Sequence, residues 1–343
     1  MALTRPSMLA RTTLVVSVVI PARNESDDVG RAIHAVIGQS FPLNQVEVVV
    51  VDGDSADDTT AVATKLLTYA GFKRWAVVQN PGGSTPSNLN RALEWARGDI
   101  IVRVDARSAI PPDYLRTVVG RLEHDTSVAV VGGSQVAISR DNSLSARSIA
   151  RALNNAYAMG GSRYRRGGAQ SGTADTVYLG AFRRQQLVEA GGWNQSFPTN
   201  QDFELNRRMS NLGDVWFEAG LPVGYIPRGT LRQIASQYHR FGQWKVRYWR
   251  ATGDKPVARQ IPLVAGPSAL VFLGVYLLAT GRVRTLGLLA VGGIVSTLAL
   301  DHVGQTEPAE DACERGLAAT TNALIGISWW SGIVRELARR PNS

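Results

Sequence analysis

The sequence holds a single cysteine, Cys313, among 343 residues. One cysteine cannot form a disulfide within the chain, so a disulfide-stapled fold is excluded and a reducing compartment is expected. Charged residues are also few, at 19%, whereas hydrophobic residues make up 44%. This balance excludes an intrinsically disordered protein. The length allows one large domain or two smaller ones.

Acidic residues are outnumbered by basic ones, 28 against 37, which gives a formal net charge of +9. The excess favours an anionic partner: nucleic acid, a phosphorylated small molecule or a lipid surface. The sequence has no zinc-finger spacing, no evident helix-turn-helix and no organised row of aromatic residues. We therefore expect no nucleic-acid partner.

Glycine is absent from the turn after the first apolar run. Residues 14–20, LVVSVVI, lead into PARNES. This turn lacks the Gly-x-Gly-x-x-Gly pattern of dinucleotide-binding domains, and no P-loop is present. It also lacks a small-residue cleavage site, so we expect no signal peptide.

Short apolar runs alternate with amphipathic helical patterns up to residue 132. This alternation predicts an α/β fold: a Rossmann-like, mostly parallel sheet with helices on both faces. The helix starts are marked by Ser26, Ser55, Ser84 and the turn Pro111-Pro112-Asp113. Strands are expected at 14–20, 46–51, 75–79, 99–104 and 127–132, and helices at 26–38, 56–70, 84–97, 112–124, 144–158, 183–190, 202–211 and 231–251.

Polar residues gather where the first, second and fourth strands end. The carboxyl ends of parallel strands share one edge of the sheet, where open α/β sheets bind ligands. Converging carboxylates there can bind a divalent cation, Mg²⁺ or Mn²⁺, which in turn holds a diphosphate. Asp57 or Asp58 can instead favour the first turn of the next helix. The candidate ligand-binding residues are Pro21, Arg23, Glu25, Asp52, Asp54, Arg103, Asp105 and Arg107.

Three uncharged apolar runs follow residue 255. They occupy 261–280, 285–300 and 317–334. A run of about twenty apolar residues can cross a bilayer, whereas shorter runs are borderline. We therefore expect a membrane-embedded helical tail.

Several ordered blocks together resemble family-two glycosyltransferases with the GT-A fold. VVIPARNE, VVVVDGDSADDT and DIIVRVDARS resemble the nucleotide-binding blocks of that family. Later blocks at 177–197, 200–209 and 237–244 agree, so the likeness covers about residues 14–250. The RVDA form and the apolar tail are most similar to the glucosyltransferase branch that extends lipid-linked repeats of succinoglycan and other exopolysaccharides.

The resemblance implies an inverting, metal-dependent transfer of a sugar from a nucleotide-sugar, expected to be a UDP-linked hexose, to a lipid-linked (polyprenyl) saccharide. It assigns the catalytic base to Asp202, although Gln201 replaces the first acid of that block. Asp105 matches the metal-binding carboxylate. Arg107 stands where the family has a second acid, so it either contacts phosphate or marks a lost metal ligand.

Other positions carry roles that the resemblance implies less strongly. His239 is a candidate metal ligand and Arg240 a candidate diphosphate contact, while Gln201 and Trp244 are assigned to the acceptor site. Packing is an equal alternative for the residues near 240. Glu204 is either a second acid or a surface partner of Arg208. The stretch RYRR at 163–166 is either a solvated loop or a phosphate contact.

The implied organisation is a basic extension at 1–13, a glycosyltransferase domain at 14–255 and a membrane-associated region at 256–343. The domain divides into a nucleotide-binding half at 14–132 and an acceptor-binding half at 133–255. Since sugar nucleotides are cytosolic, the expected location is the inner or plasma membrane with the domain on the cytoplasmic side. Other envelope glycan synthesis proteins are further candidate partners.

Two membrane arrangements fit the apolar runs. In the favoured one, 261–280 is broken by prolines and lies in the interface, while 285–300 and 317–334 cross as a hairpin. The hairpin keeps the terminal arginines inside, in line with the positive-inside tendency. It also predicts that Cys313 is accessible from outside. In the alternative, all three runs cross.

Two rival functions remain open. A polyprenyl-phosphate monosaccharide synthase would use the same fold but depend less on a base such as Asp202. A membrane-anchored binding protein with a degenerate nucleotide pocket is favoured by Arg107 and Gln201. Turnover of a sugar nucleotide would exclude the second.

Overall fold

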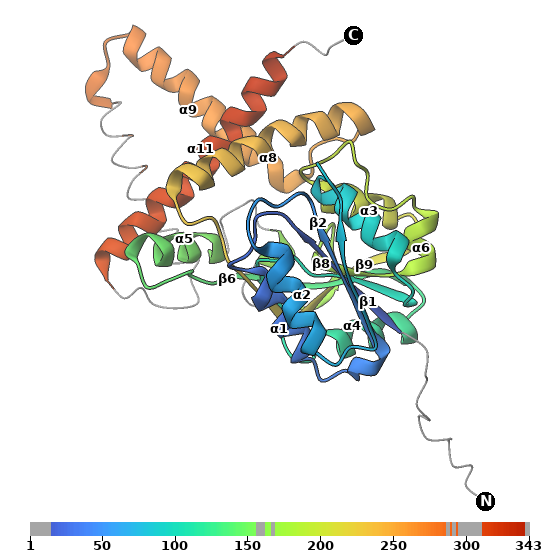
Figure 1. Cartoon of the computed structure of the whole chain (residues 1–343). Helices are drawn as coiled ribbons and strands as arrows, with labels where there is room; N and C mark the ends of the chain where they lie inside the picture. Colours follow the sequence, from blue (N-terminus) through green and yellow to red (C-terminus); the bar gives the residue numbers. More distant parts are fainter. Residues whose placement is uncertain are drawn as a thin grey trace, which may run out of the picture. The chain divides into compact units, whose positions relative to one another are not determined.

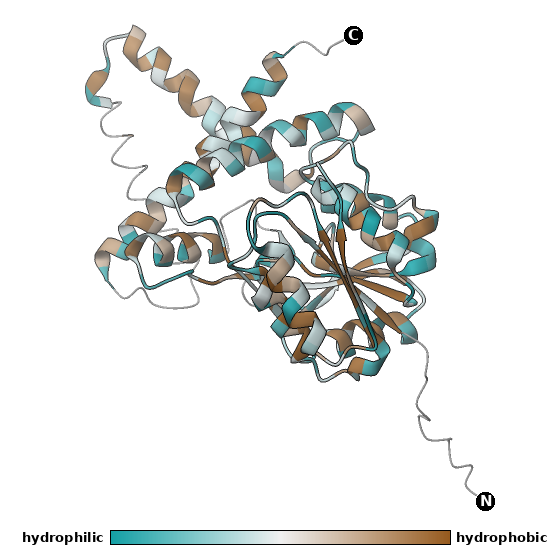
Figure 2. Ribbon diagram, in the orientation of Figure 1, coloured by the Kyte–Doolittle hydropathy of each residue, from teal (hydrophilic) through white to brown (hydrophobic). Residues whose placement is uncertain are grey.

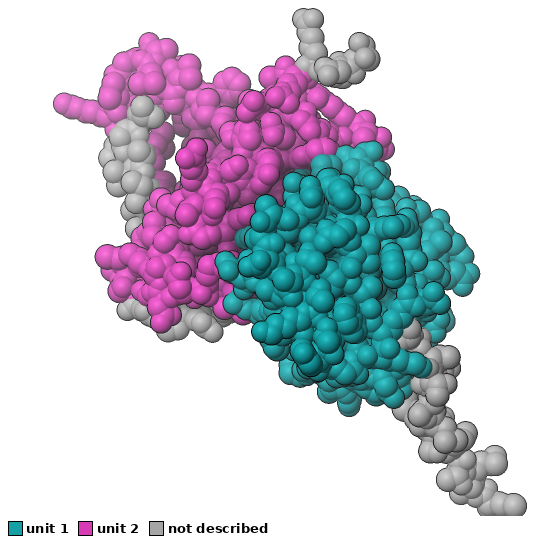
Figure 3. Space-filling view, in the orientation of Figure 1, with its two compact units in different colours: residues 1–134, 170–224 teal, residues 135–169, 225–343 magenta. Residues whose placement is uncertain are grey.

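The computed structural model describes residues 15–155, 162–165, 169–285 and 311–339, with the single residues 289 and 293. These residues fall into two compact units. The first lies within 1–134 and 170–224, and the second within 135–169 and 225–343 (Figure 3). The domain boundaries proposed above follow the sequence, and they stay predictions.

The described residues contain a nine-stranded sheet of order β3-β2-β1-β4-β8-β6-β9-β5, with β7 paired to β9 (Figure 1). The first four strands of this order are parallel, and β8 runs antiparallel to both β4 and β6. The strands are β1 (Val16–Ala22), β2 (Val46–Asp52), β3 (Arg74–Gln79), β4 (Ile100–Arg103), β5 (Ser108–Ala109), β6 (Val128–Ala137), β7 (Gly172–Thr173), β8 (Tyr178–Arg183) and β9 (Asp214–Tyr225).

The predicted α/β fold is confirmed, with one correction: the sheet is mixed rather than mostly parallel. The five predicted strands are present as β1, β2, β3, β4 and β6. The apolar runs of β1, β2 and β4 are buried on both faces, and every residue of β2 is buried, whereas most of β3 is half-buried. The other four strands were not predicted. β5 and β7 have only two residues each, and β9 largely alternates buried with more exposed positions, so these three strands show no continuous apolar run. The fourth, β8, has four consecutive buried residues.

Helices cover both faces of the parallel strands. Alternate residues of β1, such as Val16 and Val18, share one core with α1, α2 and α4. The helix α3 contacts β1 and β2, and the intervening β1 residues, which face the other way, are absent from that core. The first-unit helices are α1 (Val29–Ile37), α2 (Thr59–Tyr69), α3 (Thr85–Trp95), α4 (Tyr114–His124), α6 (Arg184–Glu189) and α7 (Gln201–Met209).

Helix starts are only partly as predicted. Ser84 caps α3 by accepting a hydrogen bond from the Ser87 N–H at 3.5 Å. The predictions for Ser26 and Ser55 are wrong, because α1 and α2 begin later, after Asp28 and Asp58. Asn24 and Asp57 engage the residues around the two serines in contacts between loops, so those segments stay outside the helices.

The second unit is built around the close packing of α11 with α8 and α5. A Cβ atom added to Gly242 would overlap the carbonyl oxygen of Trp329, and one added to Gly332 would overlap that of His239. The two glycines therefore allow direct backbone contact between α8 and α11. The helices of this unit are α5 (Leu144–Asn154), α8 (Leu231–Thr252), α9 (Ile261–Ala279) and α11 (Ala312–Ala338).

The apolar tail contains two different kinds of helix. α9 is apolar on all sides and leaves most of its large side chains exposed, Phe272 at 76% among them (Figure 2). α11 is the one described helix long and apolar enough to cross a membrane, by length and composition only. Both its ends pair with other helices of the unit: Glu314 with Arg147 and Glu336 with Arg247. Most of the run at 285–300, and the extension at 1–13, lie outside the described residues.

Candidate active site

A buried arginine joins two of the predicted site residues. Arg103, the last residue of β4, is 4% exposed. Its Nε donates to Asp105 Oδ1 at 2.7 Å and its Nη2 to Asp105 Oδ2 at 3.3 Å, while Nη1 donates to Asp202. The structure therefore brings the predicted metal carboxylate and the predicted base together around one guanidinium. The partners Arg103 and Asp202 are far apart in sequence, so the motifs alone did not indicate this bridge.

Asp202 lies in the first turn of α7, after Asn200 in the left-handed conformation with φ 64°. Burial by surrounding protein raises the pKa of the Asp202 carboxyl, Arg103 opposes the rise, and Asp105 adds to it. The side chain nevertheless keeps 46% of its surface exposed. A carboxyl group that is accessible and has a raised pKa is suited, in its deprotonated form, to accept a proton from a bound hydroxyl group.

Arg107 connects the segments that follow β4 and β1. Its Nε donates to both carboxylate oxygens of Glu25, at 2.7 and 3.0 Å, and lies 3.8 Å from Asp28 Oδ2. Two predicted ligand-binding residues therefore contact each other. In this arrangement Arg107 neutralises nearby carboxylates, and its predicted phosphate contact stays a prediction.

Asp52 acts within the loop that follows β2. It is 2% exposed and accepts hydrogen bonds from the Ser55 N–H at 3.2 Å and from the Ser55 and Thr60 hydroxyl groups. Asp54, next in the motif, is exposed and has φ 74°, an uncommon conformation that clusters at functional sites. Asp52 therefore stabilises the conformation of this loop, whereas the side chain of Asp54 stays accessible to solvent.

Of the candidates on β1, Pro21 lies within the strand opposite Val51, and Arg23 follows it as an exposed side chain. Asn24, which was not predicted, has φ 53° and accepts a hydrogen bond from the Ala56 N–H at 2.8 Å. The loops after β1 and β2 are thus joined directly. Asparagine is one of the few residues other than glycine that adopt a positive φ readily. An asparagine directly after a strand was therefore the sequence signal that could have predicted this turn.

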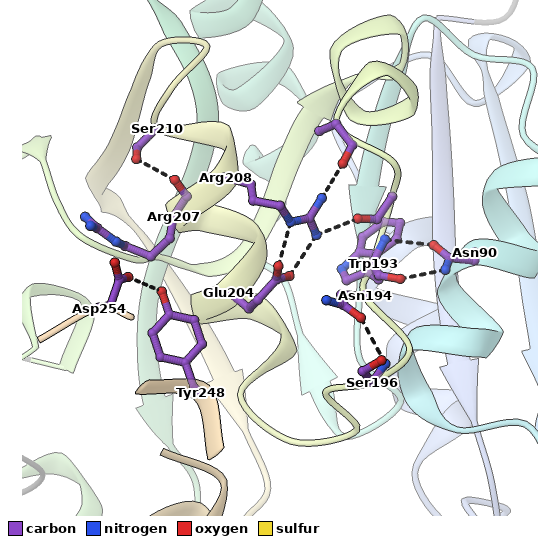
Figure 4. Close-up of polar contacts among 12 residues, drawn as sticks. Asn90, Trp193, Asn194, Ser196, Glu204, Arg207, Arg208, Ser210, Tyr248 and Asp254 are labelled. Atoms are coloured by element: carbon purple, nitrogen blue, oxygen red, sulfur yellow. Dashed lines mark hydrogen bonds and ion pairs between the residues drawn. The ribbon is translucent and has the colours of Figure 1, made fainter. Parts of the chain in front are cut away.

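Glu204 is a structural residue. It is 5% exposed and forms a bidentate pair with Arg208, at 2.6 and 2.7 Å (Figure 4). Arg208 also donates to the carbonyl oxygens of Ala190 and Gly192. Of the two alternatives for Glu204, the pair with Arg208 is present, but it is buried rather than on the surface. It fastens α7, and hence Asp202, to the loop at 190–194.

Three of the four remaining candidates belong to α8 in the second unit. His239 Nδ1 lies 2.9 Å from the Ser331 hydroxyl of α11, and its Nε2 is sealed from solvent with no hydrogen-bond partner. Trp244 stacks under the Arg247 guanidinium, 4.6 Å from the ring centroid. Arg240 is exposed. Gln201, the last of the set, begins α7 in the first unit. The predicted roles of these four residues stay predictions.

The described residues contain no group of three or more His, Cys, Asp or Glu side chains that could hold a metal ion. Asp105 nonetheless fits a cation whose remaining ligands would come from a bound diphosphate and from water. Mg²⁺ in phosphate-binding sites commonly uses one or two carboxylates, completed by substrate phosphates and water. Asp105 has 30% of its side chain exposed at the end of β4, which leaves oxygen lone pairs accessible.

Two proteins of related sequence and one solved structure are similar to this chain. Succinoglycan biosynthesis protein ExoA of Rhizobium meliloti (strain 1021) is 28% identical over 93% of this chain and 94% of its own. Glycosyltransferase AglE of Haloferax volcanii is 24% identical over 70% of this chain and 76% of its own. Among solved structures, the mannosyltransferase PcManGT from Pyrobaculum calidifontis, in complex with GDP-Man and Mn²⁺, has a TM-score of 0.63. It is 22% identical, and the match covers 98% of this chain and 91% of that one.

The sequence profile described as glycosyl transferase family 2 matches residues 17–191, just over half of the chain. The matched segment contains the ends of β1, β2 and β4 and the cluster residues Arg103 and Asp105. The resemblance noted in the sequence is confirmed, and the chain is a glycosyltransferase of family 2.

Proposed function

We propose that the protein is an inverting glycosyltransferase that moves a hexose from a UDP-linked sugar to a lipid-linked saccharide during exopolysaccharide synthesis. The observation that carries this proposal is the Arg103 bridge between Asp105 and the accessible Asp202. The bridge sets a carboxylate suited to a diphosphate-bound cation beside a carboxylate suited to deprotonating an acceptor. The relation to ExoA, a protein named for succinoglycan biosynthesis, supports the pathway class.

Asp105 is the residue that would hold the divalent cation, Mg²⁺ or Mn²⁺. When bound, such a cation offsets the negative charge of a departing nucleoside diphosphate. The structural neighbour solved with GDP-Man and Mn²⁺ is consistent with this assignment, although its likeness extends to the fold alone. In the described structure both oxygens of Asp105 accept hydrogen bonds from Arg103, which orients the carboxylate at the end of β4.

Asp202 is the proposed base. In an inverting transfer it accepts the proton of the acceptor hydroxyl while that oxygen attacks the sugar from the side opposite the leaving group. Arg103 keeps the carboxylate oriented and close to its negatively charged neighbour. General-base catalysis of this kind contributes roughly 10²–10⁴-fold in rate.

The location that fits this proposal is the inner or plasma membrane, with the first unit on the cytoplasmic side. The exposed side chains of α9 support membrane attachment, because an apolar surface of this extent is rare on soluble monomers. A lipid-linked acceptor would then be reached without leaving the bilayer. Other envelope glycan synthesis proteins stay candidate partners.

The test is turnover of radiolabelled sugar nucleotides on membranes that contain the protein, with extraction of the lipid-linked product. Asp202→Asn should keep donor affinity while kcat falls by roughly 10² or more. Asp105→Ala should abolish transfer and weaken nucleotide binding in the presence of Mg²⁺ or Mn²⁺. An α-linked donor should give a β-linked product.

Three outcomes would contradict parts of the proposal. Retention of configuration in the product would exclude the inverting mechanism. Undiminished activity of Asp105→Ala, or of the wild type in excess EDTA, would exclude the metal. A small effect of Asp202→Asn, with a lipid phosphate as acceptor, would instead indicate a polyprenyl-phosphate monosaccharide synthase.

A further inference from the structure

The second unit contains an arginine surrounded by tyrosines. Arg165 ends the short 3-10 turn Arg163–Arg165, and its Nε lies 3.1 Å from the Tyr164 hydroxyl oxygen. Its guanidinium also stacks on the Tyr164 ring, 5.2 Å from the centroid. Tyr238 of α8 accepts a further hydrogen bond from it, and Tyr225 is close enough to interact electrostatically. All four residues belong to the second unit.

No carboxylate among the described residues pairs with Arg165. Its recorded side-chain partners are tyrosines. Burial raises the pKa of Tyr238 to about 12, so this hydroxyl group is neutral at physiological pH and does not compensate the guanidinium charge. A partly buried cation without a counter-charge is costly, and proteins normally pair such groups. Among the described residues, the charge of the Arg165 guanidinium is therefore not compensated by a carboxylate.

The surrounding sequence strengthens the charge argument. Between Asp141 and Asp175 there is no acidic residue, whereas there are arginines at 147, 151, 163, 165 and 166. Arg147, the first of these five, pairs with the carboxylate of Glu314. This stretch supplies most of the second unit's first segment, so the local potential around Arg165 is positive.

Tyr238 is closely packed, and Arg165 is half-buried. Tyr238 is 3% exposed and packs edge-to-face on Phe241, with ring centroids 5.3 Å apart. Among the described residues, no nitrogen of Arg165 is both sealed from solvent and without a hydrogen-bond partner. The guanidinium donors that the tyrosines do not use therefore face solvent. A planar guanidinium with free donors matches phosphate oxygens well.

We propose that Arg165, with the hydroxyl groups of Tyr164 and Tyr238, forms an anion site that takes the phosphate group of the lipid-linked acceptor. The identity of the ligand rests on the proposed function, whereas the anion site itself rests on the residues described above. The same chemistry would suit a phosphate or diphosphate ester from another source. Donor and acceptor phosphates must therefore be tested separately.

The first arm measures binding of inorganic pyrophosphate to the full-length chain in detergent by titration calorimetry. Arg165→Gln should weaken binding about tenfold or more, since it removes both the charge and the planar donor array of the guanidinium. Arg163→Gln is the matched control, because Arg163 carries the same charge in the same turn but is exposed. Equal effects of the two substitutions would overturn the site, since they would indicate only a general positive potential.

Two milder variants guard against a folding defect. Tyr238→Phe keeps the aromatic packing and removes only the hydroxyl group, so it should weaken pyrophosphate binding less than Arg165→Gln does. Arg165→Lys should recover part of the affinity, because it restores the charge without the planar donor array. Unchanged binding in every folded variant at these two positions would also overturn the site.

The second arm identifies the source of the phosphate. Nanodiscs of phosphatidylcholine with polyprenyl monophosphate should compete with pyrophosphate in the wild type, and nanodiscs without it should not. Arg165→Gln should raise the KM for the lipid-linked acceptor and leave the KM for the donor unchanged. A rise confined to the donor KM, or displacement of pyrophosphate by a nucleoside diphosphate in Asp105→Ala, would overturn the acceptor assignment. If no sugar nucleotide is turned over but pyrophosphate binding still depends on Arg165, the proposed function fails and the anion site stands.

Discussion

Arg103 is a cation almost without solvent contact, held by two carboxylates that come from different elements. Replacing it leaves Asp105 and Asp202 to repel each other without compensation. Because a misplacement of about 1 Å can cost about 10² in rate, we expect Arg103→Leu to lower kcat by 10- to 100-fold. The kcat of Arg103→Lys should lie between those of the wild type and Arg103→Leu, because a lysine keeps the charge but cannot bridge both carboxylates.

Steady-state kinetics with separate kcat and donor KM values measure this effect. Arg97→Leu is the matched control, because Arg97 is an exposed arginine that precedes the same strand. The positioning role of Arg103 would be contradicted by a change in donor KM alone, which would mean that Arg103 binds the nucleotide directly.

Asp57 joins the loops that follow β1 and β2, so its contribution to the free energy of unfolding can be measured as a function of pH. Partial desolvation would raise the pKa of Asp57, but hydrogen bonds from Thr59 and Ser26 outweigh it and lower the pKa from 3.8 to about 2. A lowered folded-state pKa means that the carboxylate contributes stability at and above pH 3.8, and that this contribution is lost as the pH falls toward 2. The difference in urea midpoint between wild type and Asp57→Asn should therefore shrink over that interval. A difference that is constant with pH would contradict the role of the charge.

At the residue scale, the sequence located the site better than it described the contacts there. Asp105 and Asp202 were found because each lies in a recognisable block, and the structure brings both to Arg103. The contacts of Arg107 with Glu25, and of Asp52 with Ser55, were not predicted. They join or shape loops through specific side-chain geometry, and periodicity carries no information about such contacts.

The crossing of α8 and α11 depends on the absence of side chains at two positions. A Cβ atom at position 332 would overlap the backbone of α8, so Gly332→Ala must separate the helices. Overpacking of this kind typically costs about 1–3 kcal/mol in the free energy of unfolding. Gly326→Ala in the same helix meets nothing within 4 Å and should be neutral or stabilising by up to about 1 kcal/mol.

Denaturant or thermal unfolding of the two alanine variants in one detergent measures the difference. If both variants unfold alike, the backbone contact between α8 and α11 does not hold the unit together. A fall in stability confined to Gly332→Ala would confirm that the second unit depends on this crossing.

At the element scale, prediction succeeded where burial on two faces makes a strand a continuous apolar run. β1, β2 and β4 are of this kind, and amphipathic helices follow them. α11 shows the opposite case. Its composition resembles that of a membrane span, yet residues such as Thr321 and Ser328 are buried against other helices of the unit. Composition measures how apolar a segment is, and it does not specify whether lipid or protein covers it.

At the scale of the whole molecule, the contacts of α11 bear on the membrane arrangement. Glu314 near its start pairs with Arg147 of α5, and Glu336 near its end pairs with Arg247 of α8. If α11 crossed the bilayer, α8 would have to enter the bilayer too, because the two helices are closely packed. That helix carries five basic side chains, at 232, 240, 245, 247 and 250, and each charged side chain at the bilayer centre costs about 2.5–3.5 kcal/mol or more. These contacts favour an α11 that stays packed on α8 and α5, and the hairpin expected from the sequence stays a prediction.

Cys313 distinguishes these arrangements. It is exposed, and it is adjacent to Glu314, which is tied to α5. If α11 stays packed on α8 and α5, and these helices lie on the cytoplasmic side as proposed, a membrane-impermeant maleimide should label Cys313 only after spheroplasts are permeabilised. Thr64→Cys in a Cys313→Ser background provides the cytoplasmic reference, because Thr64 is an exposed residue of α2. Labelling of Cys313 from outside in intact spheroplasts, with the reference protected, would restore the hairpin. It would also mean that the paired glutamates separate from their arginines when the protein enters the membrane.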